Sequence, residues 1–178
     1  EGGMIVTNNS EFAEQCQILK KNGASKRYYN TSIGWNFKMP DVNAALGISQ
    51  LKRIESIIER KNSCAKFYDE LFSTIPEITA PIVKEYNRTT YMLYSILVKD
   101  NKLREKIRIG LESQGIETRI NFPPMHLQPA YIDRFGDTRG SLPISEDISE
   151  RILGLPIFIN MTQTDQELIV NTIKQSMN

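Results

Sequence analysis

The longest helical pattern in this chain lies between residues 41 and 74. Apolar residues recur there at a spacing close to 3.6, which places them on one face of a helix. Apart from Gly47, no helix-breaking residue interrupts the pattern. The apolar positions are Val42, Ala45, Leu46, Ile48, Leu51, Ile54, Ile57 and Ile58, followed by Ala65, Phe67, Tyr68, Leu71 and Phe72. We therefore expect a long connecting helix over residues 41–75, either continuous or divided in two by a kink.

The preceding residues give weaker signals. The apolar run Met4–Thr7 predicts a short strand, Ser10 is a plausible N-cap for a helix that Gly23 ends, and residues 24–38 have the composition of a loop. A lone strand cannot form a sheet, so residues 4–7 need partners that this chain does not obviously supply.

After residue 75 the pattern alternates between strands and helices. In order, we expect a strand at 90–98, a helix from Asn101 to Gln114, a strand at 116–120, a proline-stiffened loop at 121–130, a helix at 145–153, an extended segment at 155–159 and a final helix capped by Thr162. This order predicts an α+β fold, with helices packed on a small, mostly antiparallel sheet. The expected division is residues 1–40, then the connecting helix 41–75, then a small domain at 76–178.

Composition sets limits on the kind of protein and on its partners. The 178 residues suffice for one domain or two small ones, and 40% hydrophobic with 24% charged residues is typical of globular proteins. The formal charge of +1 predicts no bulk attraction to nucleic acid or to a membrane. No apolar run approaches the roughly 20 residues that span a bilayer.

The cysteine and histidine content argues against a metal site. Cys16 and Cys64 both fall in helical patterns, and we expect them to be small, buried or half-buried side chains in a reducing, cytoplasmic compartment. His126 is the single histidine, which excludes a site with several histidine ligands.

Three residues could bind a ligand, and each has a plainer explanation. Asn36 can donate hydrogen bonds to an anion, although alone it is better explained as a turn-former after Gly34. His126 lies in a stiff loop between prolines and is, in isolation, equally a structural residue. Arg119 could bind substrate, or it could be an ordinary residue at the edge of a strand.

Two motifs resemble a known family. The stretch Gly34–Leu51, GWNFKMPDVNAALGISQL, together with the initial Glu1-Gly2-Gly3, resembles the DegT/StrS family of pyridoxal-phosphate (PLP) aminotransferases, which act on nucleotide-linked keto sugars. In that family Glu-Gly-Gly follows shortly after the Schiff-base lysine. The resemblance thus implies that the catalytic lysine lies upstream of Glu1. It also implies that the chain is the carboxyl-terminal part of a fold-type I aminotransferase, inactive by itself.

The resemblance also assigns roles to residues. Asn36 matches the asparagine that binds the PLP phosphate of the neighbouring subunit. Lys38, which stands where the family usually has arginine, is expected to bind substrate. Residues 123–131 are similar to a Pro-x-His motif whose histidine, here His126, lies near the sugar. Residues 115–119, which end at Arg119, look like those of members that aminate a 4-keto-6-deoxy sugar at C4, such as perosamine synthases.

The implied function is transfer of an amino group, commonly from glutamate, to a nucleotide-diphosphate keto sugar for polysaccharide or antibiotic biosynthesis. It implies a homodimer with shared active sites. Two alternatives stay open. One is a PLP-dependent sugar dehydratase, in which histidine replaces the lysine. The other is a non-catalytic regulatory or interaction domain with the same fold.

Overall fold

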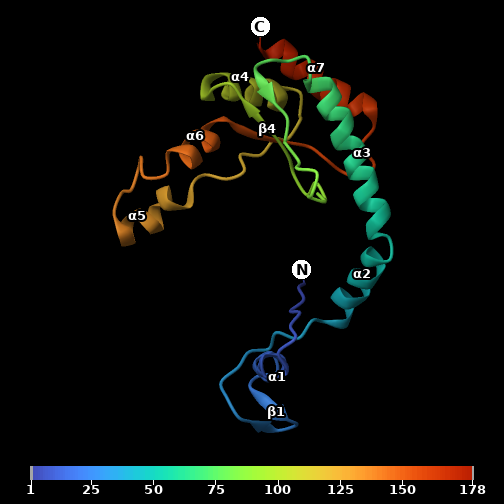
Figure 1. The fold of residues 1–178 in the computed structure, drawn as a ribbon, viewed down its shortest axis with the longest axis vertical. Helices are drawn as coiled ribbons and strands as arrows, with labels where there is room; N and C mark the ends of the chain where they lie inside the picture. The colour runs from blue at the N-terminus through green and yellow to red at the C-terminus, as the bar shows by residue number, and fades with distance from the viewer. Residues whose placement is uncertain (1, 178) are drawn as a thin grey trace. The chain divides into compact units, whose positions relative to one another are not determined.

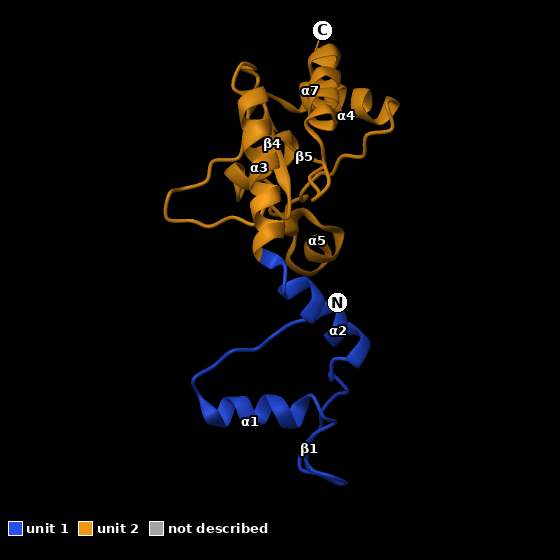
Figure 2. Ribbon diagram, turned by 90° about the vertical axis from the view of Figure 1, so that its right-hand side faces the viewer, with its two compact units in different colours: residues 1–54 blue, residues 55–178 orange. Residues whose placement is uncertain are grey.

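The structure is a computed structural model that describes residues 2–177. Glu1, the first residue of the Glu-Gly-Gly motif, therefore lies outside the described residues. The chain divides into two compact units, residues 1–54 and residues 55–178, which Figure 2 shows in different colours. We call them unit 1 and unit 2. The three-part division expected from the sequence remains a prediction.

Unit 1 contains the helices α1 (Ser10–Leu19) and α2 (Asp41–Leu51) and the short strands β1 (Ala24–Lys26) and β2 (Tyr29–Asn30). The N-cap of α1 is Asn9 rather than Ser10, because the Asn9 side chain accepts a hydrogen bond from the Phe12 N–H at 3.0 Å. The strands β1 and β2 pair as an antiparallel hairpin, so the prediction of a plain loop at 24–38 was wrong for its first half.

The predicted strand at Met4–Thr7 does not form. These residues have no regular secondary structure, and Met4 and Val6 are 86% and 88% exposed. No strand among the described residues pairs with them, and a strand without a partner leaves its backbone groups unsatisfied by a ladder. The strand prediction was therefore wrong, because residues 2–177 provide no strand with which these apolar residues could pair.

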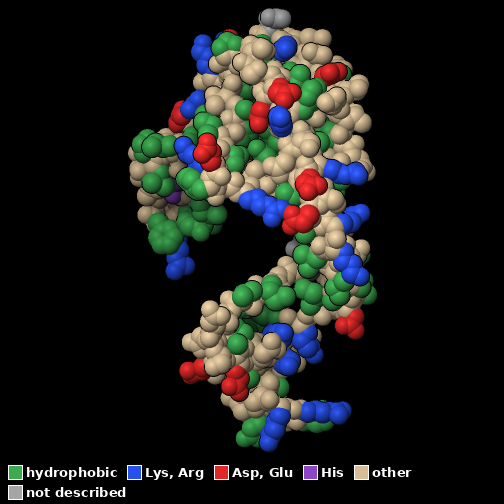
Figure 3. All heavy atoms as spheres, turned by 45° about the vertical axis from the view of Figure 1, so that its right-hand side comes forward, with side chains coloured by type: hydrophobic (Ala, Val, Ile, Leu, Met, Phe, Trp, Pro, Cys, Tyr) green, Lys and Arg blue, Asp and Glu red, His purple; other side chains and the backbone are tan. Residues whose placement is uncertain are grey.

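The expected connecting helix forms two helices, α2 and α3 (Ile54–Phe72), which are separated at Lys52 and Arg53. Of the two predicted forms, the one with two separate helices is the form that the structure shows. The apolar residues of α2 stay open to solvent: Val42 is 71% exposed and Leu46 is 62% exposed. Figure 3 shows that hydrophobic side chains reach the molecular surface in many places.

Unit 2 is built on a three-stranded sheet in the order β3 (Ile78–Thr79), β4 (Tyr94–Val98) and β5 (Ile152–Leu155). Both pairs are antiparallel, with Ile96 opposite Leu153 in the β4–β5 pair. Its helices are α3, α4 (Asn101–Ser113), α5 (Pro129–Phe135), α6 (Pro143–Arg151) and α7 (Gln163–Met177), with a 3₁₀ turn, η1, at Met125–Leu127. The predicted α+β class with a small antiparallel sheet is confirmed.

A single apolar core holds unit 2 together. The side chains of β4 alternate, so Tyr94, Ile96 and Val98 are buried while the residues between them are half-buried. Tyr68 of α3 stacks on Tyr94 at 4.8 Å between ring centroids, and α4 packs against α7. Figure 1 shows α3, α4 and α7 gathered around β4. The buried apolar residues are Cys64, Ala65, Tyr68, Phe72, Ile75, Ile78, Tyr94, Ile96, Val98, Ile107, Leu111, Leu153, Leu155, Met161, Ile169, Val170 and Ile173.

Several predicted bounds in unit 2 were wrong. The strand expected at 90–98 begins only at Tyr94, and α4 is capped by Asp100 rather than Asn101, since the Asp100 carboxylate accepts from the Leu103 N–H at 2.8 Å. The predicted strand 116–120 is reduced to one bridge, between Arg119 and Gly154.

Prolines explain the remaining shifts. The extended segment expected at 155–159 pairs instead at 152–155, since Pro156 has no N–H with which to continue the ladder. The helix expected at 145–153 runs from Pro143, a favoured first position, to Arg151. The loop expected at 121–130 contains η1 and the start of α5. In the described part of the chain, no helix has the length and apolarity needed to cross a bilayer.

Candidate functional site

The segment that carries Asn36 is fixed by backbone hydrogen bonds to the end of α1. The Trp35 N–H donates to the Leu19 carbonyl at 2.8 Å, and the Phe37 N–H donates to the Lys20 carbonyl at 3.1 Å. Asn36 itself forms an antiparallel bridge with Lys21. These bonds hold the segment in extended form beside the helix terminus.

Two glycines make this close approach possible. Gly23 has φ +77°, which favours glycine, and a Cβ on Gly34 would lie 2.3 Å from the Gly23 nitrogen and 2.6 Å from the Leu19 oxygen. No side chain fits at that distance from backbone atoms. The Gly34 of the sequence motif is thus explained by packing within unit 1.

Side chains alternate along this segment. Trp35 and Phe37 stack with ring centroids 5.8 Å apart and planes 5° from parallel. Together with Met39 they line an apolar hollow of about 430 Å³ beside α1, whereas Asn36 and Lys38 do not line it. In an extended chain successive side chains point to opposite faces, so Asn36 and Lys38 share the other face.

The face with Asn36 and Lys38 offers hydrogen-bond donors without partners. Neither side chain makes a hydrogen bond or ion pair with any residue in the range 2–177. The amide supplies two N–H donors and the ammonium three, and a phosphate offers only acceptors and negative charge. This donor set therefore fits a phosphate such as that of PLP. Lys38 supplies a point charge in place of the fork that arginine would offer.

Arg119 lies in unit 2, at a pocket of about 290 Å³ lined by Met92, Leu93, Glu117, Arg119, Asn121, Gly154, Leu155, Pro156, Ile157 and Phe158. Its backbone is fixed, because the Arg119 N–H donates to Gly154 at 3.0 Å and its carbonyl accepts from Gly154 at 2.7 Å. Its guanidinium is 69% exposed and lies 3.5 Å from the Glu117 carboxylate. The side chain is therefore free to turn toward a ligand.

Glu117 and Asn121 are two pocket residues whose role was not predicted from the sequence. Both line the same pocket as Arg119. The Asn121 amide donates to the Ser95 hydroxyl at 3.2 Å. The sequence does contain a pattern that indicates them, because polar residues at 117, 119 and 121 lie on the same side of an extended segment.

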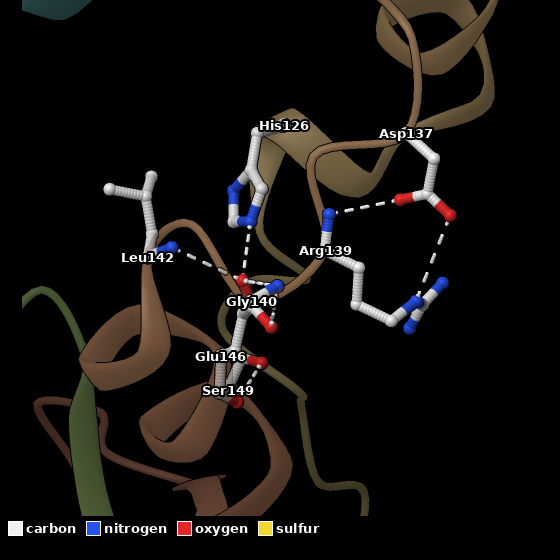
Figure 4. A network of polar contacts seen from close by, with 7 residues as sticks. All are labelled: His126, Asp137, Arg139, Gly140, Leu142, Glu146 and Ser149. Atoms are coloured by element: carbon white, nitrogen blue, oxygen red, sulfur yellow. Dashed lines mark hydrogen bonds and ion pairs between the residues drawn. The ribbon is translucent and has the colours of Figure 1, made fainter.

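His126 belongs to a separate polar network, shown in Figure 4. Its Nε2 lies 2.9 Å from the Glu146 Oε1, and the two side chains are only 16% and 18% exposed. The hydrogen bond from His126 is the main cause that lowers the pKa of Glu146, with a further contribution from the Gly140 N–H. Glu146 was not selected from the sequence, since no local pattern links residues 20 positions apart.

The predicted site residues thus form separate groups. Asn36 and Lys38 share one face in unit 1, and Arg119 lines its pocket in unit 2. His126 is not among the lining residues of that pocket. The structure therefore does not bring His126 and Arg119 together within one pocket. Their roles toward cofactor and sugar stay predictions.

Comparison with known proteins gives consistent matches. The chain is 35% identical to the uncharacterized protein MJ1066 of Methanocaldococcus jannaschii, over 98% of this chain and 49% of that protein. It is 32% identical to the GDP-perosamine synthase of Vibrio cholerae, over 100% of this chain and 49% of the enzyme. The structure of DesV from S. venezuelae, in complex with a ketimine intermediate, matches with a TM-score of 0.88 at 25% identity, covering 97% of this chain and 46% of DesV.

The chain spans about half the length of the curated relatives that it matches. The match to the family extends nevertheless over almost the whole sequence, residues 1–174. It includes both units and all the candidate residues described above. The chain belongs to the DegT/DnrJ/EryC1/StrS aminotransferase family.

Proposed function

We propose that this chain is the carboxyl-terminal part of a PLP-dependent aminotransferase. The complete protein would transfer an amino group from glutamate to a keto sugar carried on a nucleotide diphosphate. The family match over residues 1–174 and the similarity to a GDP-perosamine synthase support this function. The observation that carries it is the face of Asn36 and Lys38, because two unpartnered donors beside a fixed backbone suit a phosphate.

In this proposal PLP, when bound, supplies the electron sink that amino-group transfer requires and that side chains lack. Asn36 and Lys38 hold its phosphate through N–H donors and positive charge. The lysine that the family places before Glu1 would hold the cofactor and move protons. The 178 residues by themselves are therefore expected to be inactive.

The proposal includes a homodimer with shared active sites, in which Asn36 binds the phosphate of the cofactor in the neighbouring subunit. The small residues Ala44, Ala45 and Gly47 of α2 would let a partner backbone approach closely. His126 and Arg119 would bind the sugar, and residues 115–119 point to amination at C4. We expect the enzyme to work in the cytoplasm.

The first test replaces Asn36 by aspartate in the complete protein. Asn36→Asp keeps the shape of the side chain but places a negative charge beside the phosphate, so PLP should bind at least about tenfold more weakly, roughly 1.4 kcal/mol. Asn30→Asp is the matched control, because Asn30 is exposed in β2 of the same unit. PLP occupancy is measured by absorbance. Equal occupancy in the two variants would remove Asn36 from the cofactor site.

A second test asks whether Asn36 acts across the dimer. A variant without the cofactor lysine is mixed with Asn36→Asp, the subunits are allowed to exchange, and activity is measured at a PLP concentration too low to fill the Asn36→Asp site. If Asn36 serves the neighbouring subunit, each mixed dimer has one intact site and activity returns. If both residues serve the same subunit, the mixture stays inactive.

The reaction itself is tested with ¹⁵N-glutamate and a 4-keto-6-deoxy sugar nucleotide. Appearance of ¹⁵N in the sugar supports the aminotransferase. Loss of a hydroxyl group without incorporation of nitrogen would instead identify the dehydratase. A complete protein that binds no PLP would contradict both.

A further inference from the structure

The Glu146 carboxylate gathers donors from separate parts of unit 2. It accepts from His126 Nε2 at 2.9 Å, from the Gly140 N–H at 2.9 Å and from the Leu142 N–H at 3.3 Å, all at Oε1. Its Oε2 is 3.0 Å from the same Gly140 nitrogen. The Glu146 side chain on α6 is therefore hydrogen-bonded both to η1 and to the loop that follows α5.

This geometry determines which nitrogen of the imidazole carries the proton. An ionised carboxylate only accepts hydrogen bonds, so His126 Nε2 must donate. A neutral imidazole has one N–H, which leaves Nδ1 as an acceptor. The lowered pKa of Glu146 keeps this carboxylate ionised near neutral pH. Figure 4 shows Nδ1 on the side of the ring away from Glu146, with no interaction drawn to it.

We propose that Glu146 is a positioning residue: it holds His126 in the Nε2–H tautomer and leaves Nδ1 to accept a hydrogen bond from a sugar hydroxyl. The assignment of the tautomer stands on the geometry of residues 126 and 146. The assignment of the sugar hydroxyl rests on the proposed function.

The tautomer can be measured directly in the 178-residue chain. His126 is its only histidine, so the ring nitrogens give a single set of ¹⁵N signals. Spectra are recorded above the pH range in which imidazole titrates, for the wild type, for Glu146→Gln and for Asp147→Asn, with free histidine in the same buffer. Asp147→Asn is the matched control, because it makes the same change one residue later on α6, where the carboxylate pairs with Arg151.

The wild type and Asp147→Asn should show Nε2 protonated and Nδ1 unprotonated. Glu146→Gln should shift toward the tautomer mixture of free histidine, because the amide can donate as well as accept. A wild-type ring with protonated Nδ1, or with the free-histidine mixture, would overturn the proposal, and so would a Glu146→Gln spectrum identical to that of the wild type. Should Glu146→Gln not fold, the wild-type spectrum decides.

The role of Nδ1 is tested in the complete enzyme. Glu146→Gln should raise the KM for the sugar nucleotide by up to about tenfold, with a smaller change in kcat, while Asp147→Asn leaves both unchanged. If the enzyme transfers no amino group, the proposed function fails and the tautomer assignment stands. If transfer occurs but Glu146→Gln changes the tautomer without changing this KM, the assignment of Nδ1 to the sugar is overturned.

Discussion

Unit 1 and unit 2 differ in how they are stabilised. Unit 2 has a continuous apolar core that reaches from Cys64 to Ile173, and it includes fully enclosed rings such as Tyr68 and Tyr94. In the described part of unit 1, no apolar side chain is buried, and neither α1 nor α2 contributes a buried residue. Backbone hydrogen bonds and two close glycines give unit 1 its local shape instead.

Because of this difference, the candidate ligand-binding residues of unit 1 and of unit 2 are held in place by different kinds of interaction. Arg119 pairs with Gly154 of the buried strand β5, whereas Asn36 belongs to a segment whose aromatic neighbours are open, with Trp35 54% and Phe37 69% exposed. His126 lies on η1, which contributes no buried residue to the core. In the proposed function, the rest of the enzyme and the neighbouring subunit would cover the side chains of Trp35 and Phe37. Substitutions should therefore act on stability in unit 2 and on local order in unit 1.

The largest effect is expected from Tyr68→Ala in unit 2. Tyr68 is fully buried, stacks on Tyr94 and donates to the Pro156 carbonyl at 3.1 Å. Removal of such a ring leaves a cavity and should lower the free energy of unfolding by about 3–5 kcal/mol. Urea unfolding measures the change.

Tyr86→Ala is the control, because Tyr86 is 85% exposed. It should change the free energy of unfolding by no more than about 0.5 kcal/mol. An equal decrease in the free energy of unfolding for the two variants would show that the apolar core does not stabilise unit 2. It would contradict the difference drawn between the two units.

The next effect concerns the backbone of unit 1. In Gly34→Ala, the added Cβ would meet the Gly23 nitrogen at 2.3 Å, so the segment must move away from α1. Such overpacking costs about 1–3 kcal/mol, and the amide protons of Trp35 and Phe37 should exchange about tenfold faster or more. Hydrogen exchange followed by NMR measures this, and the unfolding of unit 2 should not change.

Gly47→Ala makes the same substitution where nothing lies within 4 Å of the added atom. In the middle of α2, alanine should stabilise the helix by roughly 0.5–1 kcal/mol. Unchanged protection of Trp35 and Phe37 in Gly34→Ala would contradict the close approach described for unit 1.

A smaller effect is expected from acid. The pKa of Glu146 is lowered in the folded state, chiefly by the hydrogen bond from His126. Its contribution to stability is thus complete above the unfolded pKa of about 4.3 and is lost as the pH falls through the lower, folded value. The unfolding midpoint of the wild type should decline in that window more steeply than that of Glu146→Gln. Parallel curves would show that Glu146 contributes nothing.

The smallest effect is expected from Val6→Ser. Val6 is 88% exposed and lies outside any strand, so the free energy of unfolding of this chain should change by less than about 0.5 kcal/mol. Met4, Ile5 and Thr7 line the hollow beside α1, but Val6 does not. A larger loss, measured in the same urea titration, would mean that the Val6 side chain also makes contacts in this chain.

Local patterns predicted some elements well. The helix α4 followed from its apolar period and its polar start, since Ile107 and Leu111 lie one turn apart and are both buried. The cap was displaced by one residue, because Asp100 and Asn101 are both good caps and only the backbone angles decide between them. The strand at 116–120 failed for a different reason, since alternation indicates two faces but does not supply a partner.

The α+β class, the order of the long helices and the family could be predicted from the sequence, because apolar periods and the motif around Asn36 are local properties of the chain. Only the tertiary structure showed that Asn36 and Lys38 share a face while Trp35, Phe37 and Met39 line the opposite one. It alone joined His126 to Glu146 and Arg119 to Gly154. Such pairs depend on how distant segments pack, and packing is set by the whole core and by backbone hydrogen bonds, which a local pattern does not specify.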